Sequence, residues 1–150
     1  MRLALFEPDI PQNTGALMRL CACLNVPLDI IEPCGFLLSD KNLKRAGMDY
    51  ISHLDLTRHL DWNAFKGAAA GKRLVLISTR SSSSFLDFAF QPEDILLAGR
   101  ESSGVPSYVW QYCAAQVKIP MITAARSLNV ALASALVLGE ALRQTGGYPS

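Results

Sequence analysis

Short, unbroken apolar runs recur along this chain and constrain its fold more than any other feature. Apolar runs of about this length, bounded by turn-forming or polar residues, are typical of strands buried on both faces of a parallel sheet. We predict such strands at Leu3–Phe6, Leu74–Ser78 and Ile95–Ala98, and a further strand at Leu28–Ile31, which Pro33 ends. Gln116–Ile119 is predicted as a last strand, while His53–Arg58 fits either a weak strand or a loop.

The segments between these runs favour helices. We expect one from the end of the Asp9–Gly15 loop to about Leu24, and others at Ser39–Ala46, Asp61–Phe65 and Tyr108–Cys113. Strands that alternate with helices predict an α/β domain whose mainly parallel sheet carries helices on both faces. With 150 residues, half of them hydrophobic, the chain is long enough for one domain over residues 1–150.

The C-terminal part combines a polar loop with an apolar helix. Arg126, Ser127 and Asn129 precede a helix whose first turns, Val130–Leu138, are almost entirely apolar. This run is shorter than the ~20 residues that a bilayer requires, so we expect a helix packed on more than one side. Polar or glycine-rich loops also follow Ile77, Ala98 and Ile119. Because ligands bind at the carboxyl ends of parallel strands and at helix N-termini, we expect the functional site there.

Composition and the common motifs exclude several classes of site. The net charge of +1 makes no case for nucleic-acid binding by itself, so phosphate contacts would need a local patch. The four cysteines form no CxxC pair and lie far from His53 and His59, which argues against a metal site. We expect buried free thiols, and the N-terminus has no signal-peptide pattern, which favours a cytoplasmic protein. The GxGxxG, GxxxxGK[ST] and GxSxG motifs are absent.

Four other motifs occur in order along the chain: PQNTGALMR at Pro11–Arg19, GRESSGVP at Gly99–Pro106, KIPM at Lys118–Met121 and RSLN at Arg126–Asn129. Together with IIEPCGF and LKRAGMDY, they resemble the motifs of the SPOUT class of RNA methyltransferases. The sequence is most similar to the small tRNA 2′-O-methyltransferases that act on the wobble nucleotide, C34 or U34. This resemblance spans practically the whole chain.

The resemblance implies an α/β fold with a deep C-terminal trefoil knot, which ordinary topology rules would not predict. It also implies S-adenosylmethionine (SAM) as the methyl donor, a homodimer, and the anticodon stem-loop of tRNA as the substrate. No metal and no membrane are implied. A methyl donor without a phosphate explains why the phosphate-binding glycine motifs are missing.

The same resemblance implies a set of site residues. Main chain near Ile77, Gly99, Ile119 and Ser127 would line the cofactor site, with Thr79, Met121 and Leu128 beside it. Gly99 and Gly104 would permit close backbone approach or a positive φ. Glu101 would bond a ribose hydroxyl or backbone amides, or else cap the following helix. Asn129 would bond main chain across the loop or cap the long helix, and Ser127 could share the capping role.

Substrate contacts are expected from polar and basic residues. Arg19 would bind a phosphate or stabilise the attacking ribose oxygen, because a guanidinium is a poor base. Asn13 would be either an N-cap or a substrate contact. Backbone contacts to tRNA are expected from the basic cluster Lys41, Lys44 and Arg45, with Arg58, Arg80 and Arg126 elsewhere in the chain. One departure is Arg80-Ser81, where relatives often carry a Lys-Gly pair.

Three other functions stay open on the sequence. The same fold could methylate another tRNA or a ribosomal RNA, or it could be a non-catalytic RNA-binding module. A flavodoxin-like FMN protein is a weaker option. The sequence also leaves open which tRNAs are substrates, whether C34, U34 or both are accepted, and which group takes the proton.

Overall fold

The computed structural model describes residues 1–39, 41–42 and 51–150. Its strands are β1 (Arg2–Phe6), β2 (Leu28–Ile31), β3 (Leu56–His59), β4 (Leu74–Ile77), β5 (Ile95–Ala98) and β6 (Ala115–Val117). Its helices are α1 (Pro11–Leu24), α3 (Trp62–Ala68), α4 (Ser107–Tyr112) and α5 (Val130–Thr145), with a 3-10 turn at Ile51–His53.

The six strands form one sheet in the order β3-β2-β1-β5-β4-β6, and every neighbouring pair is parallel. Leu3 of β1 is in register with Leu28 of β2 and Leu96 of β5. The chain order reverses between β1 and β5, and in open α/β sheets ligands bind near such a reversal, beyond the carboxyl ends of the strands. The predicted parallel α/β fold is confirmed.

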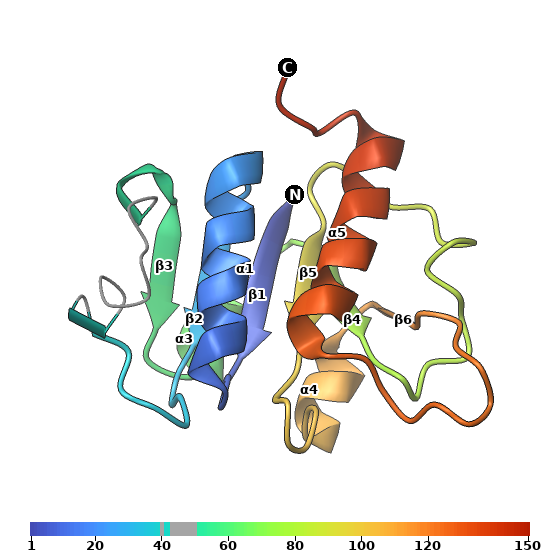
Figure 1. Ribbon diagram of the computed structural model, residues 1–150, viewed down its shortest axis with the longest axis horizontal. Coiled ribbons are helices and arrows are strands. Elements are labelled where there is room, and N and C mark those ends of the chain that lie inside the picture. The colour runs from blue at the N-terminus through green and yellow to red at the C-terminus, as the bar shows by residue number, and fades with distance from the viewer. Residues whose placement is uncertain (40, 43–50) are drawn as a thin grey trace.

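Alternation along the strands divides the core into two layers. Leu3, Leu5 and Val75 face α1 and α5, whereas Ala4, Phe6 and Leu76 face α3 and α4. Figure 1 shows α1 and α5 side by side on one face of the sheet. Because both faces are covered, β4 and β5 are apolar at every position, whereas β2 contains one buried charged residue, Asp29, which is paired with Arg2 and His59.

Several predicted boundaries need correction. The Asp9–Gly15 loop is wrong from Pro11 onward, because α1 already begins there with the proline in its first turn. The last strand ends at Val117 rather than Ile119, since Lys118 instead bonds Ser83 and Phe85 through its backbone. The ambiguous segment contains both a 3-10 turn and the edge strand β3.

The predicted basic helix at Ser39–Ala46 lies mostly outside the described residues. Lys41 and Asn42 are helical, and the Ser39 hydroxyl accepts a hydrogen bond from the Asn42 amide at 3.2 Å. The predicted substrate residues Lys44 and Arg45 both lie outside the described part of the chain. The trefoil knot stays a prediction.

The cysteines are free thiols in three kinds of environment, with Cys34 partly buried. Cys21 and Cys113 are buried, and burial raises the pKa of both thiols to about 12. Cys23 is exposed, so the expectation of a buried thiol is wrong there. Among the described residues no group of histidines, cysteines and carboxylates could hold a metal ion, and no helix is long and apolar enough to cross a membrane.

Candidate functional site

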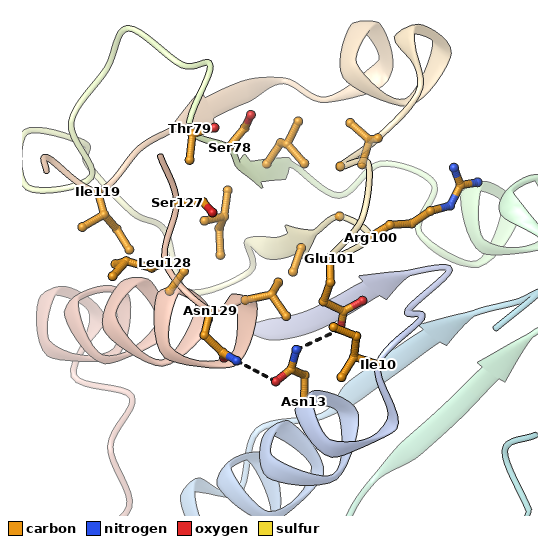
Figure 2. Close-up of a pocket in the computed structure, with 18 of the residues that line it drawn as sticks. Ile10, Asn13, Ser78, Thr79, Arg100, Glu101, Ile119, Ser127, Leu128 and Asn129 are labelled. Atoms are coloured by element: carbon orange, nitrogen blue, oxygen red, sulfur yellow. Dashed lines mark hydrogen bonds between the residues drawn. The ribbon is translucent and has the colours of Figure 1, made fainter. Parts of the chain in front are cut away.

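A cavity of about 400 Å³ lies beyond the carboxyl ends of β4 and β5. Loops that follow β4, β5 and β6 form its walls, and the start of α5 closes one side (Figure 2). It is lined by Ile10, Asn13, Leu76, Ile77, Ser78, Thr79, Ala98, Gly99, Arg100, Glu101, Gly104, Val105, Ile119, Met121, Ser127, Leu128, Asn129, Val130 and Ala133.

The structure brings together every residue that the sequence assigned to the cofactor site. These residues are Ile77, Thr79, Gly99, Glu101, Ile119, Met121, Ser127, Leu128 and Asn129, and all of them line the cavity. They come from segments far apart in the chain that meet because parallel strands end at one edge of the sheet. Their role in binding a cofactor stays a prediction.

The loop after β5 is a tight turn that depends on two glycines. Arg100 and Gly104 exchange backbone hydrogen bonds of 2.9 Å in each direction. A Cβ on Gly99 would lie 2.8 Å from the carbonyl carbon of Gly104, closer than real contacts allow. Gly104 has φ +65°, which disfavours other residues. The predicted close approach and positive φ are thus both confirmed, one at each glycine.

A chain of side-chain hydrogen bonds connects α5, α1 and the loop after β5 (Figure 2). Asn129 caps α5 by accepting the amides of Ala131 and Leu132 at 2.8 and 3.2 Å. Its amide nitrogen donates to Asn13 Oδ1 at 2.8 Å, and Asn13 Nδ2 donates to Glu101 Oε1 at 3.4 Å. One wall of the cavity is therefore held by three side chains from different elements.

These hydrogen bonds show which of Asn129, Asn13 and Glu101 cap a helix. Asn129 is a helix cap, as predicted. Asn13 is not an N-cap, because Ile10 occupies that position of α1 and Asn13 lies buried in the first turn. Glu101 does not cap α4, whose N-cap position is Pro106 and carries no side-chain bond. Its carboxylate instead accepts the backbone amide of Asp9 at 2.9 Å, as one predicted alternative required.

Asp9 and Glu101 form a reciprocal pair at the mouth of the cavity. The Glu101 amide donates to Asp9 Oδ1 at 3.2 Å, and the Ser102 hydroxyl donates to Asp9 Oδ2. Burial, followed by the neighbouring Asp9, raises the pKa of Glu101. Hydrogen bonds from Glu101 and Ser102 lower the pKa of Asp9. Glu101 is therefore the carboxyl of the pair that takes a proton first.

Arg100 lines the cavity but is directed away from its centre (Figure 2). It pairs with Glu7, and its guanidinium lies 5.1 Å from the ring centroid of Phe6. Its charge is therefore largely neutralised, and it joins the end of β1 to the loop after β5.

The predicted substrate residues are distributed differently. Asn13 lines the cavity. Arg19, Lys41 and Arg126 have exposed side chains and are not among the residues that line it. Arg19 lies on α1, whose buried positions include Leu17, Met18 and Cys21 on its core-facing side.

Sequence reasoning missed part of the lining and the Asp9 contact. Ligands bind beyond the carboxyl ends of parallel strands, and this rule, applied to every residue at those ends, also finds four neighbours of the predicted residues: Leu76, Ser78, Ala98 and Arg100. Asp9 follows the end of β1, the strand beside β5, and the same rule points to it. Ile10, Val105, Val130 and Ala133 carry no such signal, because only the packing of α1, α4 and α5 brings them to the cavity.

Comparison with known proteins identifies the family. Residues 1–139 match the SpoU rRNA Methylase family. A tRNA (cytidine(34)-2′-O)-methyltransferase of Beijerinckia indica is 56% identical over 146 residues, which cover 96% of this chain and 91% of that protein. The enzyme of the same description from Escherichia coli K12 is 40% identical over 151 residues, covering 99% and 96%.

Solved structures agree with this result. One that concerns 2-OH methylation of C/U34 on tRNA has a TM-score of 0.89 and 44% identity, covering 95% of this chain and 94% of its own. The AdoMet complex of the SpoU methyltransferase AviRb from Streptomyces viridochromogenes has a TM-score of 0.84 and 26% identity, covering 96% and 57%. The resemblance to SPOUT methyltransferases is confirmed, and the chain belongs to the SpoU rRNA methylase family.

Proposed function

We propose that this protein transfers a methyl group from SAM to the ribose 2′-oxygen of the wobble nucleotide, C34 or U34, of tRNA. The observation that carries the proposal is the strand-end cavity, which gathers every residue expected for the cofactor site. Relatives 40% and 56% identical, matched over nearly their whole length, are tRNA (cytidine(34)-2′-O)-methyltransferases. The full chain would act as one methyltransferase domain.

The cavity has the chemistry that a nucleoside-like methyl donor requires. Its volume lies within the range of roughly 300–1,000 Å³ typical of small-molecule sites. Leu76, Ala98 and Val105 supply apolar surface, while Ser78, Thr79 and Ser127 supply hydroxyls. SAM has an adenine, a ribose and no phosphate, so this mixture of apolar and hydrogen-bonding groups fits it. When bound, SAM supplies an electrophilic methyl group on a sulfonium.

The protein's own contribution is mainly positioning. Backbone groups at Ile77, Gly99 and Ile119 would fix the adenosine part, and the Glu101–Asn13–Asn129 network would hold the wall opposite. Holding two reactants in line removes much of the entropic part of the barrier. Arg19 lies outside the cavity lining, so we place it on the RNA, where it would bind a phosphate or the developing oxyanion. Arg126, Lys41, Lys44 and Arg45 would contact the RNA backbone.

A homodimer is part of the proposal. Leu132 and Leu136 of α5 are 61% and 51% exposed, and Ile122 and Leu128 in the preceding loop are 76% and 39% exposed. An apolar face beside a binding site is typical of a subunit interface. Leu128 also lines the cavity, so a second copy on this face would shield the bound cofactor from water. A tRNA substrate favours action in the cytoplasm.

The test is methyl transfer with isotope-labelled SAM and tRNA from cells that lack this gene. We expect label on the ribose of nucleotide 34, mapped by nuclease digestion and mass spectrometry. Arg19→Ala should lose turnover while retaining SAM affinity. Lys72→Ala lies near the amino end of β4, away from the cavity, and should retain both. Label only in ribosomal RNA would replace the proposed substrate, and a protein that does not bind SAM would overturn the proposal.

A further inference from the structure

Most described arginines are neutralised by a carboxylate. The ion-paired ones are Arg2, Arg58, Arg73, Arg100 and Arg143. Arg80 differs, because its guanidinium carbon lies 4.7 Å from the ring centroid of Trp110 and no described carboxylate forms a salt bridge with it. A ring orients a guanidinium through its negatively polarised face but does not cancel its charge. The N–H donors of Arg80 therefore remain available to an anionic ligand.

A second cavity, of about 200 Å³, opens beside this pair. It is lined by Arg80, Ser107, Trp110 and Gln111. An aromatic ring and a guanidinium offer planar surfaces on which an unpaired base can stack. The hydroxyl of Ser107 and the amide of Gln111 can donate and accept hydrogen bonds at the edge of a base. The second cavity thus has the composition of a nucleobase site.

The second cavity adjoins the first through the end of β4. Ser78 and Thr79 line the first cavity, and Arg80, the next residue, lines the second. The Arg80 amide donates to the Ser78 hydroxyl at 3.2 Å, which fixes the turn between them. An RNA strand with one ribose at the first cavity would therefore carry a neighbouring nucleotide past the second.

Trp110, the aromatic side chain of the second cavity, is held in place by the rest of the protein. Trp110 is half-buried and packs against the core layer that contains Phe65 and Val109. The backbone carbonyl of Trp110 also accepts a hydrogen bond from Gln116 Nε2 at 3.2 Å. A preorganised surface loses little entropy when a ligand binds, so this site can contribute to affinity.

We propose that the second cavity binds an unpaired anticodon-loop base next to the methylated nucleotide. The base contacts the Trp110 ring and the Arg80 guanidinium, while Arg80 also neutralises a phosphate of that strand. Ser107 and Gln111 contact the edge of the base. This inference rests on the proposed function for the identity of the RNA, and it adds residues that determine which loop sequences are accepted.

The first experiment measures binding of a fluorescein-labelled anticodon stem-loop by anisotropy. Trp110→Ala should weaken binding by about 5- to 100-fold, from the stacking energy of one base. Trp110→Phe should recover part of this loss, because it retains an aromatic ring. Arg80→Ala should also weaken binding and reduce the dependence of log Kd on log salt by about one unit. Lys72→Ala, which removes an exposed cation beside the amino end of β4, should leave affinity unchanged.

A blunt RNA duplex of the same length separates base stacking from general phosphate binding. Trp110→Ala should not change duplex affinity, because a paired base cannot enter the cavity. Equal losses on both RNAs would overturn the base site, as would wild-type affinity of Trp110→Ala for the stem-loop. SAM affinity, measured for each variant, should match wild type and reports that the fold is intact.

Steady-state methylation distinguishes failure of this inference from failure of the proposed function. If the wild-type enzyme methylates tRNA, the Trp110→Ala and Arg80→Ala variants should show a raised KM for tRNA with kcat nearly unchanged. An active wild-type enzyme whose variants keep the wild-type KM overturns the inference alone. A wild-type protein that methylates no tRNA overturns the proposed function, while the binding comparison still decides the base site.

Discussion

At the residue scale, Asn129 uses the two ends of one amide for two tasks. Its oxygen caps α5 and its nitrogen donates to Asn13. The cap contributes to the stability of the helix, whereas the bond to Asn13 positions Glu101 at the cavity wall. The two tasks can be separated by substitution, because aspartate keeps the acceptor and lacks the donor.

Asn129→Ala should lower the free energy of unfolding by about 1–2 kcal/mol, the usual value of a helix N-cap. Asn129→Asp should stay within roughly 0.5 kcal/mol of wild type, because aspartate is an equally good cap. Both variants should bind SAM about three- to tenfold more weakly, since the bond to Asn13 is lost. Urea unfolding and calorimetric titration measure the two effects. Wild-type SAM affinity in Asn129→Asp would show that the network does not shape the site.

Gly99 shows how a missing side chain lets the two ends of one loop approach each other. Gly99→Ala places a Cβ against the backbone of Gly104, where no flexible side chain can move away. We expect a loss of about 1–3 kcal/mol of stability, as for other overpacked positions, together with weaker SAM binding. The control is Gly67→Ala in α3, where nothing lies within 4 Å and about 0.5–1 kcal/mol should be gained. Similar unfolding midpoints for the two variants would contradict this reading of the turn.

At the element scale, α5 begins at Val130, where the sequence predicts it. Its start follows from Asn129 as a cap, and its end from Gly146, which takes the left-handed conformation. Its almost continuous apolar sequence covers two kinds of surface. Val137 and Leu138 are fully buried in the core, whereas Leu132 and Leu136 face outward. The apolar pattern alone does not distinguish these two faces.

Leu136→Glu tests the proposed homodimer. If the apolar face of α5 is its interface, size-exclusion chromatography with light scattering should give a dimer for the wild-type protein and a monomer for this variant. A charge in the centre of an apolar interface costs several kcal/mol unless it is paired, which is enough to separate weakly held subunits. Leu60→Glu is the matched control, because Leu60 is 80% exposed and follows the edge strand β3. It should leave the mass unchanged. A Leu136→Glu variant that remains dimeric would place the interface elsewhere.

At the scale of the whole molecule, the cavity exists only because α1, α5 and three strand-end loops meet at one edge of the sheet. A ligand that occupies it binds the folded state and not the unfolded chain. SAM at 100 times its Kd should therefore stabilise the protein by about 2.7 kcal/mol. For a chain of this size, that corresponds to a rise in Tm of roughly 5–10 °C.

Differential scanning fluorimetry checks this prediction, with Leu60→Glu as a variant that should respond like wild type. Gly99→Ala should show a smaller rise in Tm at the same SAM concentration. No change in Tm for the wild-type protein would indicate that the cavity does not bind SAM.

The sequence by itself determined the elements that depend on local chemistry. Continuous apolar runs identified β1, β4 and β5, because strands covered on both faces are built mainly from apolar residues. The run at β2 is interrupted by Asp29, which is buried and paired with Arg2 and His59. The motifs then located loops that line the cavity, since the segments at Gly99–Pro106 and Lys118–Met121 directly follow β5 and β6. The cap residues Asp61 and Asn129 were also readable, because a cap is a contact between near neighbours.

Only the tertiary structure decided how distant residues divide their hydrogen bonds. Asn13 was placed in a loop as a cap or a substrate contact, yet it is a buried link between Glu101 and Asn129. Glu101 was expected to bond a ribose hydroxyl or backbone amides, or else to cap a helix, and the fold brings it to the backbone amide of Asp9, 92 positions away. Arg80 was expected as a tRNA-backbone contact and noted as a departure from relatives, but its stacking on Trp110 depends on the packing of α4. A side chain can serve several partners, and the sequence does not show which of them the fold brings within reach.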